Sequence, residues 1–188
     1  MLGQNRGCVV PGDRAMNIWL ISGASGSGKT TLCAAIVQRA RAQGRNVAGL
    51  LSPGAFVDGA RTEIWAESVR DGERRRLAGL VQQEADDLAF GIWFFDIKTL
   101  EWGNAVLRKS TDCDLLVVDE LGPLEFNLTT GWIAAFDVLS AKQFRVALVV
   151  VRPELLERAR QLWPDAEVIY AADASSCSAI QERILERI

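Results

Sequence analysis

The chain has 188 residues, of which 49% are hydrophobic and 24% are charged, the composition of an ordinary soluble globular domain. Its formal net charge is −3 and its sequence pI is about 5.1. This acidic balance disfavours nucleic acid and anionic membranes as partners, because both require a basic face on the protein.

The N-terminal residues differ in character from the rest of the chain. Residues 1–15 are polar and contain the turn Pro11-Gly12-Asp13. We therefore expect an N-terminal extension here, loosely attached or disordered, and a single domain over residues 16–188. A start of translation at Met16 is the open alternative. No segment has the apolar length of a signal peptide or of the ~18 residues of a membrane span.

Cysteine usage points to a reducing compartment. The four cysteines are widely spaced and the chain has no histidine, so a zinc site is disfavoured. Cys33 falls in a predicted helix and Cys113 beside a predicted strand, and we expect both to be small buried thiols. Cys8 and Cys177 complete the set. The expected location is cytoplasmic.

A phosphate-binding pattern lies near the start of the predicted domain. Residues 23–30 read Gly-Ala-Ser-Gly-Ser-Gly-Lys-Thr and match G-x-x-x-x-G-K-[ST]. Residues 18–22 before it predict a strand, and residues 31–40 after it predict a helix without Gly or Pro. Strand, glycine-rich turn and helix are the context in which this pattern binds phosphate. The alternative, an ordinary Gly/Ser-rich turn with an incidental lysine, is disfavoured by these flanks.

The residues of this loop have expected roles. The glycines allow the backbone N–H groups to point inward as a nest for phosphate oxygens, and the helix N-terminus adds partial positive charge. Lys29 is expected to contact the β- and γ-phosphates and to act in catalysis, and the Thr30 hydroxyl is the expected magnesium ligand. The predicted nucleotide-binding residues are Gly23, Ala24, Ser25, Gly26, Ser27, Gly28, Lys29, Thr30 and Thr31.

The middle of the chain predicts antiparallel strands. Residues 62–69 and 73–77 flank Asp71-Gly72, which is a strong signal for a two-residue hairpin turn. Residues 91–95 predict a further strand. We expect residues 54–97 to form a β-rich insertion beside a parallel sheet.

The remaining elements alternate between strand and helix. The predicted strands are 47–51, 115–119, 146–151 and 167–170, and the predicted helices are about 100–109, 132–140, 153–162 and 178–188. Apolar strands without alternation are typical of a sheet covered on both faces. With the phosphate loop, this order predicts an α/β protein: a three-layer P-loop NTPase fold with a mostly parallel central sheet and a small antiparallel β-hairpin insertion.

The strand 115–119 ends in a Walker B pattern, because its apolar residues lead to Asp119 and Glu120. In an open parallel sheet this end faces the crevice that also holds the phosphate loop. Asp119 is expected to hold magnesium opposite Thr30. Glu120 is expected to project the other way and to polarise the attacking water. An Asp-Glu pair after an apolar strand is weak by itself, and the complete phosphate loop strengthens it.

The segment that begins with this pair is more specific. Residues 119–126 read Asp-Glu-Leu-Gly-Pro-Leu-Glu-Phe. They resemble the D-E-[IL]-G-P-[ML]-E-[LF] signature of the nucleoside-triphosphatase family that includes the thermophile phosphohydrolases and the vertebrate cancer-related nucleoside-triphosphatase. The loop continuation Gly-Lys-Thr-Thr-Leu at 28–32 is also similar to that family, as are, more loosely, the hairpin and the aromatic segment 91–95. The resemblance covers roughly residues 16–188.

The resemblance implies slow, magnesium-dependent hydrolysis of nucleoside 5′-triphosphates to diphosphate and phosphate, with ATP, GTP and other triphosphates as substrates. Glu120 falls on the family's proposed water-activating carboxylate. Glu125 falls on its second acidic position, where it either supports the site or is a solvated loop residue. Gly122-Pro123 is also readable as a simple turn after the strand.

One departure from the family concerns the segment after the strand 146–151. The family usually carries a basic stretch there, often with a histidine, and this chain has Val151-Arg152-Pro153. Arg152 is a candidate catalytic arginine that reaches the γ-phosphate, an interaction that contributes about 10³–10⁵ in rate where it is well placed. The alternative is a solvent-exposed arginine at a helix start.

Two further groups carry weaker hypotheses. Arg74–Arg76 form either a mobile electrostatic lid or, more commonly for such a run, solvated hairpin charge. Trp65, Trp93 and Trp102 either stack on a nucleobase or pack in the core, and core packing is the commoner role of large aromatic residues. The guanine-reading pattern Asn-Lys-x-Asp is absent from the sequence, and no other residue pattern selects a base.

Two other functions are consistent with the motifs. A small nucleotide or metabolite kinase has the same loop and sheet but passes the γ-phosphoryl group to an acceptor. A nucleotide-dependent switch instead signals the bound nucleotide to a protein partner through ordered loops. The sequence identifies no protein partner, oligomeric state or strand order.

Overall fold

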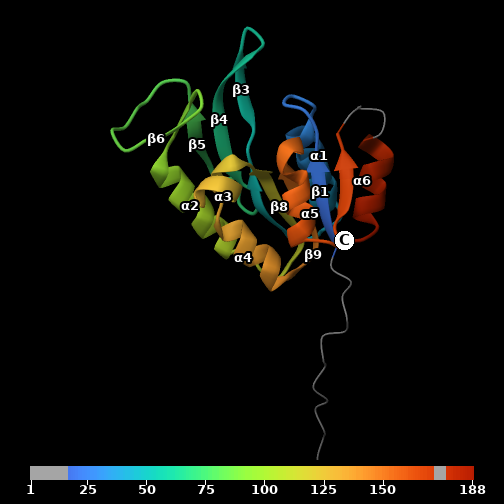
Figure 1. The fold of residues 1–188 in the computed structure, drawn as a ribbon. Coiled ribbons are helices and arrows are strands. Elements are labelled where there is room, and N and C mark those ends of the chain that lie inside the picture. Colours follow the sequence, from blue (N-terminus) through green and yellow to red (C-terminus); the bar gives the residue numbers. More distant parts are fainter. Residues whose placement is uncertain (1–16, 172–176) are drawn as a thin grey trace, which may run out of the picture.

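The computed structural model describes residues 17–171 and 177–188, where ten strands form one continuous sheet (Figure 1). The order is β10-β1-β9-β8-β2-β4-β5-β7-β6, with β3 paired to β4. The strands are β1 (Asn17–Ser22), β2 (Val47–Leu51), β3 (Gly54–Val57), β4 (Ala60–Ser68), β5 (Arg74–Gly79), β6 (Leu88–Phe90), β7 (Trp93–Phe95), β8 (Cys113–Leu121), β9 (Phe144–Val151) and β10 (Glu167–Tyr170). The predicted extension 1–15 lies outside the described residues.

Helices cover both faces of this sheet (Figure 1). They are α1 (Lys29–Ala42), α2 (Ile97–Arg108), α3 (Pro123–Leu128), α4 (Ala134–Ala141), the 3-10 turn η1 (Pro153–Leu155), α5 (Leu156–Leu162) and α6 (Cys177–Leu185). Buried side chains of α1 and α6 pack in one cluster on one face, and those of α2 to α5 pack in a second cluster on the other. The predicted three-layer α/β arrangement is confirmed.

The half of the sheet from β10 to β2 is parallel, as the unalternating apolar runs predict. The order within this half places β9 between β1 and β8. Because these strands are parallel, their C-terminal ends meet at one edge of the sheet. The phosphate loop after β1, the residue after β9 and the end of β8 therefore converge there.

The other half is the predicted antiparallel insertion, and it is larger than one hairpin. β4 and β5 flank the predicted turn at Asp71-Gly72, and β4 joins the parallel half by pairing antiparallel with β2. A second Asp-Gly turn, Asp58-Gly59, connects β3 to β4. The predicted strand 91–95 begins two residues late, because Gly91, with a φ of 60°, and Ile92 form the turn between β6 and β7.

The segment after β8 corrects the interpretation of Gly122-Pro123 as a simple turn. Pro123 opens helix α3, in the first-turn position where its fixed φ and missing N–H are tolerated. The Glu125 carboxylate accepts a hydrogen bond from the Gly122 N–H at 2.7 Å and so satisfies a free donor at the helix start.

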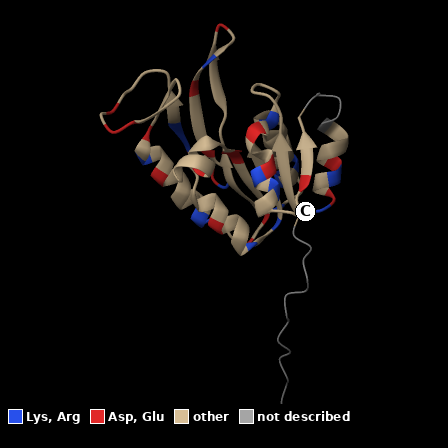
Figure 2. Cartoon of the chain, viewed as in Figure 1, with Lys and Arg blue, Asp and Glu red and all other residues tan. Residues whose placement is uncertain are grey.

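Figure 2 shows Lys and Arg interspersed with Asp and Glu along the helices and strands. Cys33 and Cys113 are buried free thiols, as predicted. Burial raises the pKa of the Cys113 thiol to about 11. Among the described residues, the model has no helix with both the length and the apolarity of a membrane span.

A close contact between α2 and the loop before α4 gives a test of the fold. A Cβ atom at Gly103 would lie 2.1 Å from Cζ3 of the buried Trp132 ring. We expect Gly103→Ala to lower the free energy of unfolding by about 1–3 kcal/mol by displacing that ring, although alanine favours helix. Urea unfolding measures the change. Glu101→Ala, exposed on the same helix, is the control and should have little effect.

Candidate nucleotide-binding site

The phosphate loop connects β1 to α1 and closes around the Lys29 ammonium group. Gly28 precedes the first residue of α1 with a φ of 84°, a conformation that favours glycine. The Lys29 Nζ donates hydrogen bonds of 2.8 Å to the carbonyl oxygens of Gly23 and Ala24. Its side chain is nearly buried, so one full positive charge lies within the curve of the loop.

Asp119 lies beside the loop, as the Walker B pattern predicts. Its carboxylate accepts a hydrogen bond from the Ser52 N–H at 3.0 Å. Burial raises the pKa of this carboxyl to about 6, although the Ser52 N–H, the nearby Thr30 hydroxyl and the Lys29 charge oppose the rise. Thr30 and Asp119 thus bring two hard oxygen donors together, the ligand type that suits a magnesium ion.

Glu120 and Arg152 form an ion pair in front of the loop. The Arg152 Nε donates to Glu120 Oε1 at 2.6 Å, and the two side chains are 47% and 30% exposed, with Arg152 the more exposed. The peptide bond between Asp119 and Glu120 is cis. Sequence reasoning assigned Arg152 and Glu120 separate roles and did not predict that they contact each other.

Glu125 is a buried support of the site rather than a solvated loop residue. Besides the Gly122 N–H, its carboxylate accepts the Trp132 N–H at 2.7 Å, and its side chain is 6% exposed. It thereby ties the start of α3 to the loop before α4. Asn104 of α2 fixes the same loop, because its amide donates to the Gly131 carbonyl at 2.7 Å.

The Glu125 carboxyl predicts a pH dependence of stability. Burial raises its pKa from 4.5 to about 7, whereas the two backbone N–H groups lower it. The unfolded chain therefore loses this proton at a lower pH than the folded protein does. The free energy of unfolding should fall by up to about 3 kcal/mol as the pH rises from 4.5 to about 7. Urea unfolding at about pH 5 and pH 8 should show a smaller fall in Glu125→Gln. Glu157→Gln, exposed on α5, is the control and should keep the wild-type slope.

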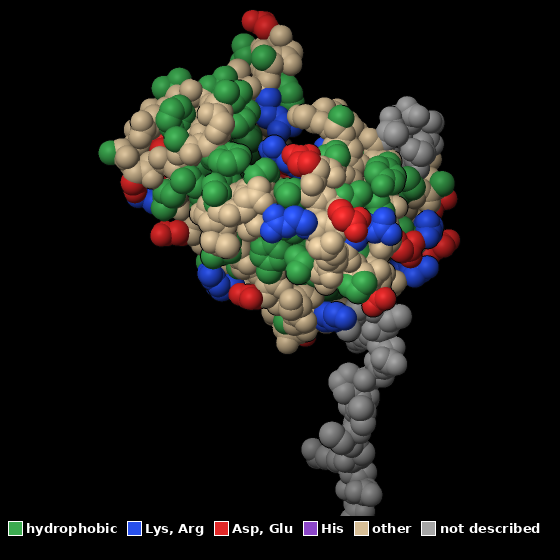
Figure 3. All heavy atoms as spheres, viewed as in Figure 1, with side chains coloured by type: hydrophobic (Ala, Val, Ile, Leu, Met, Phe, Trp, Pro, Cys, Tyr) green, Lys and Arg blue, Asp and Glu red, His purple; other side chains and the backbone are tan. Residues whose placement is uncertain are grey.

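The phosphate loop and the Glu120–Arg152 pair line one cavity of about 900 Å³, whereas Asp119 is buried and is not among the residues that line it. Figure 3 shows a hollow below the β3–β4 hairpin in which acidic and basic side chains are exposed. All predicted nucleotide-binding residues except Ser27 line this cavity, together with Glu120, Glu125 and Arg152. The Ser27 N–H instead donates to the Ala24 carbonyl at 3.2 Å within the loop.

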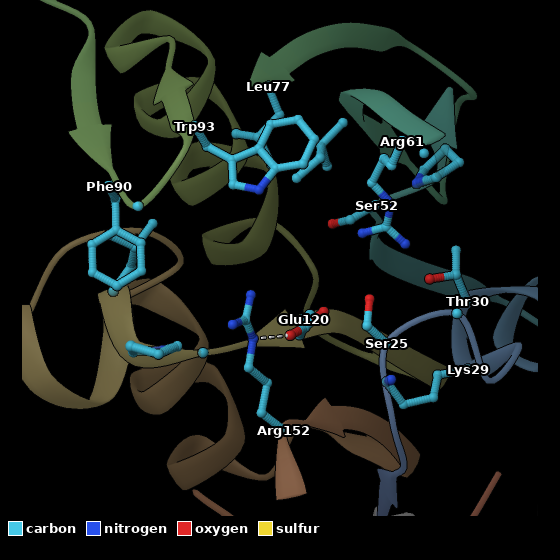
Figure 4. A pocket seen from close by; sticks show the side chains of 18 of the residues that line it. Ser25, Lys29, Thr30, Ser52, Arg61, Leu77, Phe90, Trp93, Glu120 and Arg152 are labelled. Atoms are coloured by element: carbon cyan, nitrogen blue, oxygen red, sulfur yellow. Dashed lines mark hydrogen bonds and ion pairs between the residues drawn. The ribbon is translucent and has the colours of Figure 1, made fainter. Parts of the chain in front are cut away.

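Several cavity residues come from the insertion, and of those described below only Trp93 was considered from the sequence. Arg61 of β4 extends into the cavity opposite the loop (Figure 4), with its guanidinium 5.5 Å from the centre of the Phe56 ring. Phe90 and Trp93 line the side of the cavity away from the loop. A hairpin paired to a sheet strand carries no local sign of what it faces, so no sequence signal marks Arg61.

The other proposed insertion residues lie outside this cavity. Each arginine of the lid hypothesis has a partner on the insertion or on α2: Arg74 stacks on Trp65, Arg75 pairs with Glu73 and stacks on Trp102, and Arg76 pairs with Glu63. None of these residues lines the cavity. Of the three tryptophans considered for base stacking, Trp93 is the one that does.

Comparisons with known proteins identify the family of this chain. The sequence model of a family described as NTPase matches residues 18–184. The chain is 28% identical to the nucleoside-triphosphatase THEP1 of Caldivirga maquilingensis over 69% of this chain and 73% of that protein. It is 30% identical to the nucleoside-triphosphatase THEP1 of Ignicoccus hospitalis over 70% of this chain and 74% of that protein.

Two solved structures have a similar fold. The solution structure of a human cancer-related nucleoside triphosphatase has a TM-score of 0.68 at 21% identity, covering 92% of this chain and 96% of that one. The crystal structure of THEP1 from Aquifex aeolicus has a TM-score of 0.65 at 18% identity, covering 90% and 97%. With the family model matched along nearly the whole described chain, this protein belongs to the NTPase family.

Proposed function

We propose that this protein is a magnesium-dependent nucleoside-triphosphatase that slowly hydrolyses nucleoside 5′-triphosphates, ATP and GTP among them, to diphosphate and phosphate. One observation carries the proposal. A phosphate loop with an enclosed lysine, the Thr30 side chain and a carboxylate–arginine pair all border one cavity at the C-terminal edge of parallel strands, and the buried Asp119 lies directly before Glu120 of that pair.

The loop binds the triphosphate in this proposal. Its backbone N–H groups and the N-terminus of α1 hold the phosphate oxygens, and Lys29 adds a full charge beside the β- and γ-phosphates. Thr30 and Asp119 hold the magnesium ion, which neutralises charge on the phosphates when it is bound. The Thr30 hydroxyl lies near enough to the Asp119 carboxylate to lower its pKa, and this proximity supports the assignment.

Glu120 orients the attacking water and accepts its proton, and Arg152 contacts the γ-phosphate as charge develops on it. Both groups are occupied with each other before reaction, at 2.6 Å. The pair engages Oε1 of Glu120, so only Oε2 is left to orient the water and accept its proton, and this restriction supports slow turnover. Glu125 takes no part in proton transfer and holds the start of α3 in place.

Broad base tolerance is supported by the side chains around the cavity. Among the described residues that line it there is no Asn, Gln or Asp side chain to read a base edge. We propose that no nucleobase is strongly preferred. Phosphate release from ATP, GTP, CTP and UTP, with and without magnesium, tests both statements. Rates that differ more than about tenfold among the bases, or that persist without any divalent metal, would contradict them.

Arg61 gives a prediction about substrate binding. It faces the loop across the cavity, and among the described residues it has no carboxylate partner. We expect Arg61 to stabilise the bound triphosphate and the transition state equally. Arg61→Ala should therefore raise KM about tenfold with little change in kcat. Steady-state kinetics measure both constants. Arg74→Ala removes a charge outside the cavity and should leave KM and kcat unchanged. An equal rise in KM in this control would indicate a general effect of charge.

A further inference from the structure

The cavity extends beyond the catalytic pair, away from the phosphate loop. Along the sheet, the loop follows β1, Arg152 follows β9, and Glu120 lies on β8, whereas β5, β7 and β6 come further on in the same direction. In Figure 4 the Glu120–Arg152 pair accordingly lies between the loop residues and the side chains of Phe90 and Trp93. The cavity therefore has two parts, with the catalytic pair between them.

The far part is walled by apolar and aromatic side chains, and we call it the aromatic compartment. Its residues are Leu77, Phe90, Trp93, Leu100 and Trp132. Phe90 and Trp93 are register partners across the β6–β7 hairpin, so their rings stand on the same face of it. Leu77, Leu100 and Trp132 are buried and form a fixed floor. Two adjacent rings above an apolar floor favour a flat, apolar ligand.

The charges of the cavity lie elsewhere. Its cations among the described residues are Lys29 in the loop, Arg61 opposite the loop and Arg152 in the catalytic pair. The residues of the aromatic compartment carry no charge, and the carboxylate of Glu125 borders it. A ligand with its own phosphate would therefore find no cation left to hold it. The compartment favours an uncharged ligand.

The direction in which a triphosphate would bind indicates the part that this ligand takes in the reaction. The γ-phosphate must lie next to Glu120, which acts on the attacking group, so the nucleoside at the opposite end of the triphosphate points away from Glu120. The aromatic compartment lies past Glu120 on the side from which the attack comes. This step rests on the proposed function of Glu120. It excludes the compartment as the place of the substrate's own base.

We propose that the aromatic compartment binds a phosphoryl acceptor: an uncharged small molecule with a planar ring and a hydroxyl group. The hydroxyl lies at Glu120, where water lies in the hydrolytic reaction. The protein is then a phosphotransferase towards this acceptor, and its slow hydrolysis is the reaction that remains when the compartment holds only water.

The transfer balances without any further reactant. The acceptor oxygen forms a bond to the γ-phosphorus while the bond from that phosphorus to the β,γ-bridging oxygen breaks. The electron pair of the broken bond leaves with the nucleoside diphosphate, and Glu120 accepts the hydroxyl proton. The products are the phosphate monoester of the acceptor and the diphosphate, with the proton passing from Glu120 to solvent.

Binding is tested in Glu120→Gln loaded with ATP and magnesium, in which turnover is expected to be about 10²–10⁴-fold slower than in the wild-type protein. The probes are the four ribonucleosides, pyridoxine, tyrosol and benzyl alcohol, observed by saturation-transfer NMR. We expect at least one probe to bind while ATP stays bound. Adding Trp93→Ala should weaken that binding about tenfold, the loss expected for one stacking face, and Trp93→Phe should retain most of it. Trp65→Ala, which removes a tryptophan outside the cavity, is the matched control.

Transfer is tested in the wild-type protein with γ-labelled ATP and the probe that binds. Label appearing in an organic phosphate supports the proposal. Three results would overturn it: no probe whose binding depends on Trp93, a probe that displaces ATP, or a bound probe that never acquires label. Release of inorganic phosphate without any probe is measured in the same series. It reports the proposed hydrolase function separately, because that release persists even if all probes fail.

Discussion

Replacing Glu120 by glutamine should lower kcat for triphosphate hydrolysis by about 10²–10⁴, the usual contribution of a positioned general base. Glutamine keeps the size and the hydrogen-bonding oxygen of the side chain but is unable to accept the proton from water. Triphosphate binding should change little, because the loop, Lys29 and the Thr30–Asp119 pair are untouched. Phosphate release under single turnover and calorimetric titration with ATP separate the two effects.

The matched control for this variant is Glu154→Gln. Glu154 also lines the cavity but is exposed, and in the part of the chain that the structure describes it forms no ion pair. Its replacement removes the same charge from the same cavity and should leave kcat within a few-fold of wild type. Normal turnover in Glu120→Gln would show that Glu120 has no role in proton transfer.

Replacing Arg152 by alanine should lower kcat by about 10³–10⁵, the contribution of a well-placed arginine to phosphoryl transfer. The strand order gives the reason for a large effect. β9 lies between the strand that leads into the loop and the strand that carries Glu120, so Arg152 emerges between the two groups that flank the γ-phosphate. Arg152→Lys keeps the charge without the planar donor array and should recover only part of the rate.

The control for this second variant is Arg160→Ala, which removes an exposed arginine from α5. The ion pair with Glu120 makes the outcome decisive in both directions. If Arg152 acts on the phosphate, the alanine variant is slow at saturating substrate. If it serves only to restrain Glu120, its removal frees the carboxylate and turnover rises, which would contradict the catalytic assignment.

The parts of the site that sequence reasoning located are those fixed by local chain geometry. The loop residues follow the end of β1, and Asp119 lies near the end of β8. Both can be recognised from residues that are consecutive in the sequence. Glu125 was identified through the family resemblance, but its burial was not predicted. Its carboxylate accepts hydrogen bonds from two backbone N–H groups, one before α3 and one after it, and the sequence does not show that they meet. Arg61 and Phe90 enter the cavity through antiparallel pairing, and nothing in their own segments indicates that their side chains face the phosphate loop or the catalytic pair.

The fold shows the same division. The apolar runs around Leu116 and Leu148 predicted buried parallel strands, but they did not predict the order of the strands in the sheet. Any apolar parallel strand can pair with any other, so the runs alone do not identify the neighbouring strands. The turn Asp58-Gly59 has the same residues as the predicted Asp71-Gly72 turn and was available as a signal. Helix α3 was hidden because Gly122-Pro123 is typical both of a turn and of a helix start.

The position of β9 between β1 and β8 also links ligand binding to the folding of the parallel half of the sheet. The chain segments that meet at the cavity come from distant parts of the sequence, and no two of the three strands make a complete site. A bound triphosphate therefore adds stability only to molecules in which the parallel half is fully formed, by about 2.7 kcal/mol at a concentration a hundred times Kd. We therefore expect a bound nucleotide to make the folded protein more resistant to unfolding.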